Sequence, residues 1–385
     1  MNAYSYGKNG GDTVFLEIAK RLPNIRWQIV TSRLGQRLMT EYGIKAEYHL
    51  TSTENRFGHV MITYLKRMFR AFFLDLRINK YSTILGTSDY FPDVLPIAFL
   101  KMKYRPIRWV QHIFHVIPAK RFFPHLLQRF SFFFIKRAAD MIIVDNRLLK
   151  RELSALGFAP DRININHLGI DNDYLSTFPA NGKIKYDAVY MAQLKPHKGI
   201  LDLETIWNIV NRKIPSAKLA VIGKGNKNIL KKMNKIELLG FLPDKKAADT
   251  IKTSKIFLCP SHEEGFGLAP LEAQTMGLPV VAWDLPVFAE IFPKGMIKIP
   301  MGDTKRFADA IIRLLNDHDY CHQLSKEAAE NARRFSWDKT AKNESRILMS
   351  FWKPRRGGAD RIFKMLSSRL NRGSSMTTLL CKNQK

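Results

Sequence analysis

Short apolar runs alternate with amphipathic helical stretches along most of the chain, and this alternation constrains the fold more than any other feature. The runs are rich in β-branched and aromatic residues, which is typical of buried strands. Helical patterns lie between the runs, for example at 11–22, 148–156 and 303–317. Strands separated by helices predict βαβ units and parallel sheets, so the fold class is α/β. We expect strands at 27–32, 82–88, 107–112, 141–146, 186–194, 217–225, 254–261 and 278–284.

The pattern runs twice, and 385 residues are enough for two domains with full cores. The polar, proline-bearing stretch 171–185 separates the two runs and is typical of a domain boundary. We therefore expect one Rossmann-like, doubly wound domain over 1–175 and a second one over 176–340.

The beginning of the chain departs from this pattern. A doubly wound domain normally opens with a central strand that runs into a glycine-rich turn. Here Met1 stands almost at the turn "YGKNGG" (6–11), and only "NAYSY" intervenes. Removing a central strand would leave two interior sheet edges unpaired. Two explanations are open: the sequence begins at an internal methionine and its first strand is missing, or the first strand is short.

The charge is the unusual property of the composition. Apolar content of 45% and charged content of 25% are typical of a globular protein, but a net charge of +28 is not. It predicts an anionic partner: nucleic acid, an acidic membrane surface or a phosphorylated ligand. The three cysteines, Cys259, Cys321 and Cys381, form no even disulfide set and lack metal-ligand spacing. They favour a reducing compartment, so we expect a cytoplasmic protein. No apolar run approaches the roughly 18 residues of a membrane span.

The stretch "SHEEGFGLAPLEAQTMGLPVV" (261–281) places two carboxylates around a glycine turn. It follows an expected strand and leads into a helix that begins near Leu268. Ligands of open α/β sheets bind at the carboxyl ends of strands, where helix N-termini favour phosphates. Glu264, in the turn, can accept hydrogen bonds from sugar hydroxyls, and Glu272, about one turn into the helix, suits a ribose diol.

Two other interpretations of these carboxylates are open. Glycosidases use a pair of carboxyl groups about 5–9.5 Å apart. A helix spanning the interval from Glu264 to Glu272 is roughly 12 Å long, which weakens that interpretation. The other is a helix N-terminus with a solvated glutamate.

A family resemblance adds to this argument. Residues 260–291 resemble the donor-site motif of the retaining GT-B glycosyltransferases of family 4, in which seven residues separate two glutamates. The resemblance covers roughly 7–350 and includes weaker motifs: "GGDTVFLEIAKRL" (10–22), "NHLGID" (166–171), "AQLKPHKG" (192–199), "VIGKG" (221–225) and "RFSWDKTAK" (334–342). It implies two Rossmann-like domains facing an interdomain cleft. Helices over 341–370 would pack back on the first domain, and 371–385 would form a basic tail.

The resemblance also implies roles for individual residues. Glu264 would contact the transferred sugar, Glu272 the nucleotide ribose, and Lys198 the departing diphosphate. His112, at the end of the strand 107–112, would lie near the sugar and the acceptor. The alternative is a histidine whose hydrogen bonds are satisfied at the domain surface. Where the family has arginine, this chain has Gln193, which can hydrogen-bond a phosphate but cannot offset its charge. The remaining donor-binding residues implied are Gly10, Gly11, Gly265, Phe266, Gly267 and Leu268.

No metal or other cofactor is implied. The segments "DND" (171–173) and "DHD" (317–319) mimic the metal-binding Asp-x-Asp of another glycosyltransferase class, but they lie in an expected crossing and a helical tail. "GKGN" (223–226) lacks the third glycine of a dinucleotide fingerprint.

Basic and aromatic residues gather at 56–80, at 119–137 and in the tail 352–375. Such mixtures suit the surface of an anionic membrane, although part of each is also ordinary helix core. We expect a retaining glycosyltransferase that uses a nucleotide-sugar and a hydroxyl acceptor, either lipid-linked or a cell-surface glycan precursor, on the inner face of the cell membrane. The alternatives are a non-catalytic nucleotide-sugar-binding homologue and a nucleic-acid-associated protein, although no nucleic-acid motif is present.

Overall fold

The computed structural model describes residues 10–53, 60–78, 82–104, 106–171, 183–225 and 235–350. The chain divides into two compact units, Met1–Ser345 and Arg346–Lys385. The architecture below is that of the first unit. The expected domain boundary at 171–185 lies mostly outside the described residues, as does the basic tail, so both stay predictions.

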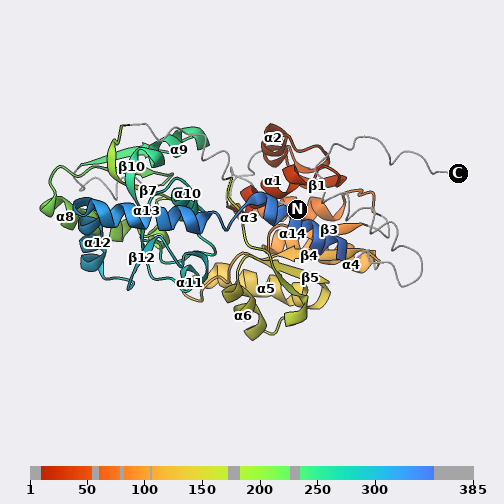
Figure 1. Ribbon diagram of the computed structural model, residues 1–385. Helices are drawn as coiled ribbons and strands as arrows, with labels where there is room; N and C mark the ends of the chain where they lie inside the picture. Colours follow the sequence, from red (N-terminus) through yellow and green to blue (C-terminus); the bar gives the residue numbers. More distant parts are fainter. Residues whose placement is uncertain are drawn as a thin grey trace, which may run out of the picture. The chain divides into compact units, whose positions relative to one another are not determined.

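The N-terminal half of this unit alternates helices and short strands, as the sequence pattern predicts (Figure 1). The runs at 108–112 and 141–144 become strands because most of their side chains are buried in a parallel sheet. The elements are α1 (Gly10–Arg21), β1 (Trp27–Ser32), α2 (Arg33–Glu41), β2 (Ala46–Ser52), α3 (Val60–Phe72), β3 (Thr83–Gly86), α4 (Phe91–Lys103), β4 (Arg108–His112), α5 (Phe122–Ala138), β5 (Met141–Val144), α6 (Arg147–Ala155), η1 (Pro160–Arg162) and β6 (Ile163–Ile165).

Two parallel sheets belong to this half. One has the order β3-β4-β5-β6, and the other pairs β1 with β2. Among the described residues, β1 and β3 each have a strand neighbour on one side only. The expectation of a missing or short first strand falls on residues 1–9, which lie outside the described residues, and it stays a prediction.

The C-terminal half repeats the pattern around a larger sheet. Its six parallel strands have the order β12-β11-β10-β7-β8-β9, which is 3-2-1-4-5-6 in chain order, the doubly wound arrangement. The chain direction across the sheet therefore reverses between β7 and β10, and both strands point their carboxyl ends toward the same edge. The elements are β7 (Tyr186–Met191), η2 (Pro196–Lys198), α8 (Ile200–Lys213), β8 (Leu219–Ile222), β9 (Ile236–Gly240), α9 (Asp244–Lys252), β10 (Ser254–Cys259), α10 (Leu268–Thr275), β11 (Val280–Trp283), α11 (Phe288–Ile291), β12 (Met296–Ile299), α12 (Thr304–Asn316), α13 (His318–Ala332) and α14 (Trp337–Ser350).

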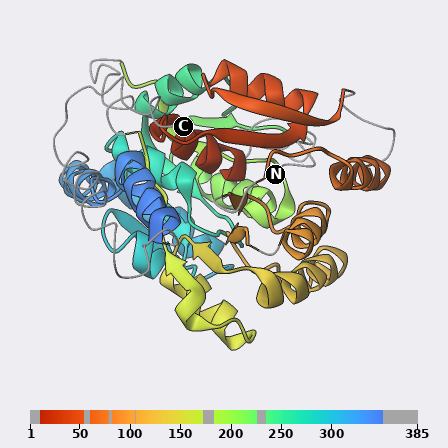
Figure 2. The same cartoon turned by 90° about the vertical axis from the view of Figure 1, so that its right-hand side faces the viewer.

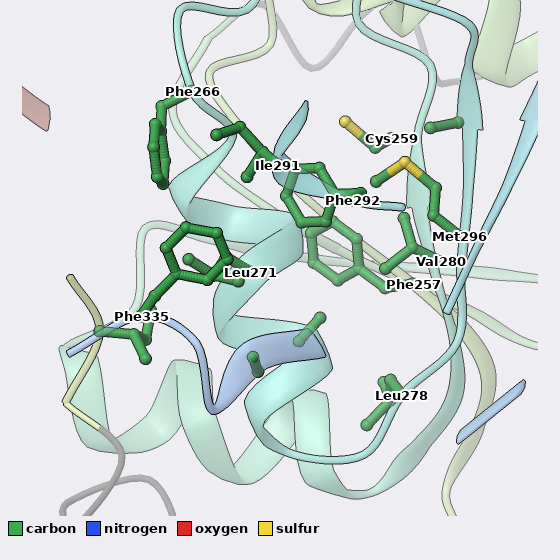
Figure 3. Packing of buried hydrophobic residues seen from close by; sticks show 14 of the residues in the cluster. Phe257, Cys259, Phe266, Leu271, Leu278, Val280, Ile291, Phe292, Met296 and Phe335 are labelled. Atoms are coloured by element: carbon green, nitrogen blue, oxygen red, sulfur yellow. The ribbon is translucent and has the colours of Figure 1, made fainter. Parts of the chain in front are cut away.

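The core of this half lies on the two faces of the six-stranded sheet. Side chains alternate along β7 and β10, so Val189 and Phe257 join one buried cluster and Tyr190 and Leu258 join the other. The first cluster, shown in part in Figure 3, also holds Phe266 of the loop after β10. This packing fixes the two strand ends on which the candidate site is built.

The α/β fold class is confirmed, and each of the eight predicted strands contains an observed one. The sequence pattern missed β2, β6, β9 and β12.

Candidate functional site

The turn between β10 and α10 is the centre of the candidate site. It comprises residues 260–267 and contains the glutamate and glycines that the sequence singled out. Gly267 has φ of 96°, a left-handed conformation that favours glycine, and it directly precedes α10. The Phe266 side chain is buried, with its ring centroid 5.6 Å from that of Phe335 (Figure 3). The turn is therefore held by an aromatic anchor while its backbone leads into a helix N-terminus.

The Lys198 ammonium joins this turn to the end of β7. Its Nζ lies 2.6 Å from Oε1 of Glu264 and 3.4 Å from the carbonyl oxygen of Glu263. Both charged side chains are mostly buried, with 23% and 16% of their surface exposed. The Tyr190 hydroxyl donates to the Lys198 carbonyl at 3.1 Å, which fixes the backbone of η2. The structure thus brings together two of the predicted site residues at the point where the chain direction reverses.

Gly199 allows this close approach. It has φ of 72° and precedes α8, and a Cβ at this position would lie 1.7 Å from the carbonyl oxygen of Pro260. No side chain fits between these backbones, so glycine is required where the loops after β7 and β10 touch.

Loops from the N-terminal half close on the same turn. Asn146, which follows β5, donates from Nδ2 to the carbonyl oxygen of Gly265 at 2.9 Å, while its Oδ1 accepts from the Leu149 amide and caps α6. A Cβ on Gly265 would lie 2.5 Å from the carbonyl oxygen of Phe114, in the loop after β4. Gly265 therefore contacts both loops through its backbone.

A second group of charges lies next to the Lys198–Glu264 pair. Glu263 Oε1 lies 3.0 Å from Lys120 Nζ, and its Oε2 lies 3.5 Å from a guanidinium nitrogen of Arg121. Burial would raise the pKa of the Glu263 carboxyl, but the Lys120 and Arg121 cations more than offset it, so that pKa lies below its usual range. Partial burial, together with Lys198 and Arg121, lowers the pKa of the His197 imidazole. Sequence reasoning did not assign Glu263, Lys120 or Arg121 to the donor site.

Further contacts hold the first part of the turn. His262 Nε2 lies 2.6 Å from Asp202 Oδ2 of α8, and the Trp283 indole donates to that oxygen at 3.0 Å. The His262 amide donates to the carbonyl oxygen of His197 at 3.0 Å. These bonds tie α8, β11 and the turn together, so the backbone around Glu263 and Glu264 is fixed from both sides.

The other predicted donor-binding residues lie on nearby or separate elements. Gln193 is exposed in the loop after β7, and Glu272 is half-buried within α10, four residues after Leu268. Gly10 and Gly11 are the first two residues of α1. Among the described residues, neither glycine makes a contact with the turn 260–267.

The structure places His112 at the end of β4, where it is buried. Its Nε2 lies 2.6 Å from Oε1 of Glu344 in α14, and the other carboxylate oxygen of Glu344 accepts from Asn166 Nδ2 at 2.9 Å. The His112 side chain thereby links β4 to α14. His115, three residues later, is exposed in the loop that packs on Gly265. The predicted role of His112 at the sugar stays a prediction.

Of the two Asp-x-Asp segments, 171–173 lies mostly outside the described residues, and 317–319 lies at the start of α13. Among the residues that the structure describes, no group of three or more His, Cys, Asp or Glu side chains could hold a metal ion. Asp317 instead caps α13 by accepting from the Tyr320 amide at 2.9 Å. Metal independence stays a prediction.

Comparison with known proteins points to one family. Residues 178–331 match the family model described as "Glycosyl transferases group 1". A phosphatidyl-myo-inositol mannosyltransferase of Mycobacterium leprae is 26% identical over 223 residues, which are 54% of this chain and 58% of that protein. A D-inositol 3-phosphate glycosyltransferase of Saccharomonospora viridis is 39% identical over 106 residues, 26% of this chain and 24% of that protein. The chain therefore spans little more than half of the first relative and a quarter of the second.

Solved structures match over a larger share of the chain. The crystal structure of HepE from Anabaena in complex with UDP-glucose has a TM-score of 0.72 and covers 91% of this chain and 98% of its own. Its sequence is 16% identical, so the likeness concerns the fold.

Proposed function

Residues 178–331 belong to the glycosyl transferases group 1 and the chain has the GT-B fold of its structural neighbours, so we propose that it transfers a sugar from a nucleotide-sugar to a hydroxyl acceptor. The observation that carries the proposal is the Lys198–Glu264 pair at the reversal point of a doubly wound sheet. In this setting a carboxylate can hold sugar hydroxyls while an ammonium stabilises a departing diphosphate.

The proposed chemistry rests on charge stabilisation. The N-terminus of α10 offers backbone N–H groups and a positive dipole end to a phosphate. Lys198 would neutralise charge that develops on the leaving diphosphate, and Glu264 would orient the sugar. Holding donor and acceptor on one face of the sugar would give transfer with retention. Glu272 would accept hydrogen bonds from the ribose hydroxyls.

The same proposal leads to two expectations, one about the nucleotide of the donor and one about metal ions. Solved structures of similar fold hold UDP, UDP with glucose, or UDP-glucose, so UDP-sugars are the first donors to test. The cationic side chains around the turn would neutralise the charge of the leaving diphosphate, as a metal ion does in other glycosyltransferases. Transfer is therefore expected to persist in a chelator.

We place the acceptor at a membrane surface, and we propose that exposed apolar and basic side chains of three helices in the N-terminal half form one face there. The helices α3, α4 and α5 pack in succession, and Figure 2 shows them in a row at the right. Phe72 of α3 and Phe99 of α4 hold them together, with ring centroids 5.3 Å apart. The face is defined by its exposed apolar residues: Ile62, Leu65, Phe69, Phe73, Phe99, Met102, Phe122, Phe123, Leu126, Phe130 and Phe133.

Several of these side chains are far more exposed than a folded core would leave them. Phe69 is 64% exposed, Phe73 74% and Phe122 71%. Exposed cations lie on the same helices, namely Lys66, Lys103 and Arg137, and Arg137 stacks on Phe133 with its guanidinium carbon 3.7 Å from the ring centroid. Aromatic side chains that insert and cations that approach anionic headgroups are the ordinary means of peripheral binding. Within the described residues, no helix is long and apolar enough to cross a bilayer.

A lipid-linked acceptor would fit this surface. The Mycobacterium leprae relative is named for mannosyl transfer to phosphatidyl-myo-inositol, a lipid. We therefore propose a hydroxyl acceptor carried on a lipid or on a glycan precursor at the inner face of the cell membrane.

Vesicle binding tests the membrane part. Replacing Lys66, Lys103 and Arg137 with Ser, or Phe69 and Phe122 with Ser, should release the protein from anionic vesicles and leave nucleotide binding intact. The matched control replaces Lys305, Lys326 and Lys339, which are exposed on α12, α13 and α14. Lys120 and Arg121 are unsuitable for this test because they pair with Glu263. Wild-type protein that stays with DNA but not with vesicles would contradict the proposal.

A thermal-shift screen of nucleotide-sugars, followed by a transfer assay, tests the activity. A donor at 100 times its dissociation constant stabilises a protein by about 2.7 kcal/mol, which is measurable as a higher melting temperature. Binding without hydrolysis or transfer would identify a non-catalytic homologue, and binding of no nucleotide-sugar would contradict the proposal entirely.

A further inference from the structure

We propose that Arg121, assisted by Lys120, binds the diphosphate of the donor nucleotide and supplies the positive charge that Gln193 does not. Both cations lie in the N-terminal half, in the loop that leads into α5. The inference rests on the proposed function and assigns its phosphate-binding side chains.

The first step is the charge of two residues in the loop after β7. A nucleotide diphosphate carries several negative charges. In the loop after β7, Gln193 offers only a neutral amide, and Lys198 already lies 2.6 Å from the Glu264 carboxylate. Further cations would therefore stabilise a diphosphate that is held next to Glu263 and Glu264.

The second step is the position of two cations from the N-terminal half. Arg121 and Lys120 reach Oε2 and Oε1 of Glu263, at 3.5 and 3.0 Å, and Lys198 Nζ reaches the backbone oxygen of the same residue at 3.4 Å. Three cations from two halves of the unit thus converge on one residue, beside the N-terminus of α10. Arg121 and Lys198 also act together on His197, whose pKa both lower.

The third step concerns what Glu263 does there. Its carboxylate presents two oxygens to the cations, as a phosphate group does. Lys120 is 63% exposed and Arg121 35%, whereas the Glu263 side chain is only 15% exposed. Both cationic side chains therefore reach water and can turn toward a bound diphosphate beside Glu263. Arg121 is the principal ligand because its planar guanidinium can bind two phosphate oxygens at once.

Two variants that break the same ion pair separate this proposal from a purely structural role. Arg121→Ala removes the phosphate ligand, whereas Glu263→Gln removes the competing carboxylate and releases both cations. The assay is calorimetric titration of the full chain with UDP, GDP and ADP. A charge-assisted hydrogen bond is worth about 1.5–3 kcal/mol, so Arg121→Ala should weaken binding roughly 10- to 150-fold. Glu263→Gln should tighten binding several-fold.

A second substitution completes the test. Gln193→Arg introduces a cation in the loop after β7 and should restore most of the affinity that Arg121→Ala loses. Arg212→Ala, an exposed arginine in the last turn of α8, is the matched control and should bind as the wild type does. Melting temperatures of all variants show whether each one is folded.

The outcomes are distinguishable. If the wild type binds none of the three nucleotides, the proposed function fails and the assignment of Arg121 with it. If the wild type binds but Arg121→Ala binds equally well, only the assignment fails. If Arg121→Ala and Glu263→Gln weaken binding alike, the ion pair is a structural link and the proposal is wrong.

Discussion

Lys198 and Glu264 are 66 residues apart in the chain, and their charged atoms lie 2.6 Å apart at the carboxyl ends of β7 and β10. The pair is mostly buried, so each charge depends on the other for compensation. The pair lies where open α/β sheets bind ligands, so it is the part of the site that we expect to act on the donor.

The two glutamates around the turn should respond differently to substitution. Glu272→Ala should raise the KM for the donor roughly 10- to 150-fold, because the ribose loses a charged acceptor worth about 1.5–3 kcal/mol. Glu264→Ala should chiefly lower kcat, because Glu264 would act on the reacting sugar. Steady-state kinetics on a donor identified by the thermal screen measure both. Wild-type constants in both variants would show that the turn is not the donor site.

Gly199 should tolerate no side chain. Gly43 and Gly199 have nearly equal φ of 74° and 72°, but a Cβ meets nothing within 4 Å at Gly43 and backbone at 1.7 Å at Gly199. Gly43→Ala should therefore cost only the left-handed strain of about 1–2 kcal/mol. Gly199→Ala should cost clearly more and should also weaken donor binding. Denaturant unfolding compares the two, and equal losses would mean that the loops after β7 and β10 can separate freely.

Asp145 should make stability depend on pH. Burial, with Glu290 adding to it, raises the pKa of this carboxyl well above its usual range, although hydrogen bonds from Asn146 and the backbone act against the rise. A carboxyl whose pKa is raised by folding favours the folded state at low pH, and this stability is lost as pH rises from about 4 to the folded value. Asp145→Asn should therefore melt higher than the wild type at pH 7.

The advantage of Asp145→Asn should shrink as pH falls and vanish at about pH 3, below the unfolded pKa of about 4, where the wild-type carboxyl is protonated in both states. Asp161→Asn, at an exposed site in η1, is the control and should show no such trend. A melting-temperature difference that is constant over this pH range would contradict the account of Asp145.

The His112–Glu344 contact should contribute more to the stability of the folded protein than to its catalytic activity. His112 is 5% exposed and Glu344 is completely buried, and Asn166 also depends on Glu344. Removing one partner of a buried pair typically costs about 3–5 kcal/mol. His112→Ala and Glu344→Ala should lose similar stability and similar activity per folded molecule. A much larger activity loss in His112→Ala alone would support the role at the sugar that the family resemblance implies.

The fold could be predicted from the sequence because its apolar runs are typical of buried strands and of few other structures. The runs 256–259 and 278–283 are continuous and apolar, as is typical of strands buried on both faces. The missed strands are short or partly exposed: β9 carries Glu237 and β12 carries Lys298. Their pairing depends on the neighbouring strand rather than on their own composition.

The site could be predicted only in part. The glutamates and glycines of the turn are local in sequence and therefore visible. The approach of Lys120 and Arg121 to Glu263 is not, because it joins loops that are over 140 residues apart. Two adjacent glutamates in so basic a chain were the available signal. The burial of His112 depends on α14, more than 220 residues away, and no local pattern indicates it.

The central claim is that Lys198 stabilises a departing nucleoside diphosphate, and release of that diphosphate from nucleotide-sugars measures it most directly. The wild type should release nucleoside diphosphate from at least one nucleotide-sugar when an acceptor or water is available. Lys198→Ala should lose at least about 100-fold of this rate, because a charge that acts at the leaving group contributes several kcal/mol to the transition state. Lys195→Ala, an exposed neighbour in the same loop, should keep it. A folded Lys198→Ala protein with the wild-type rate would contradict the account.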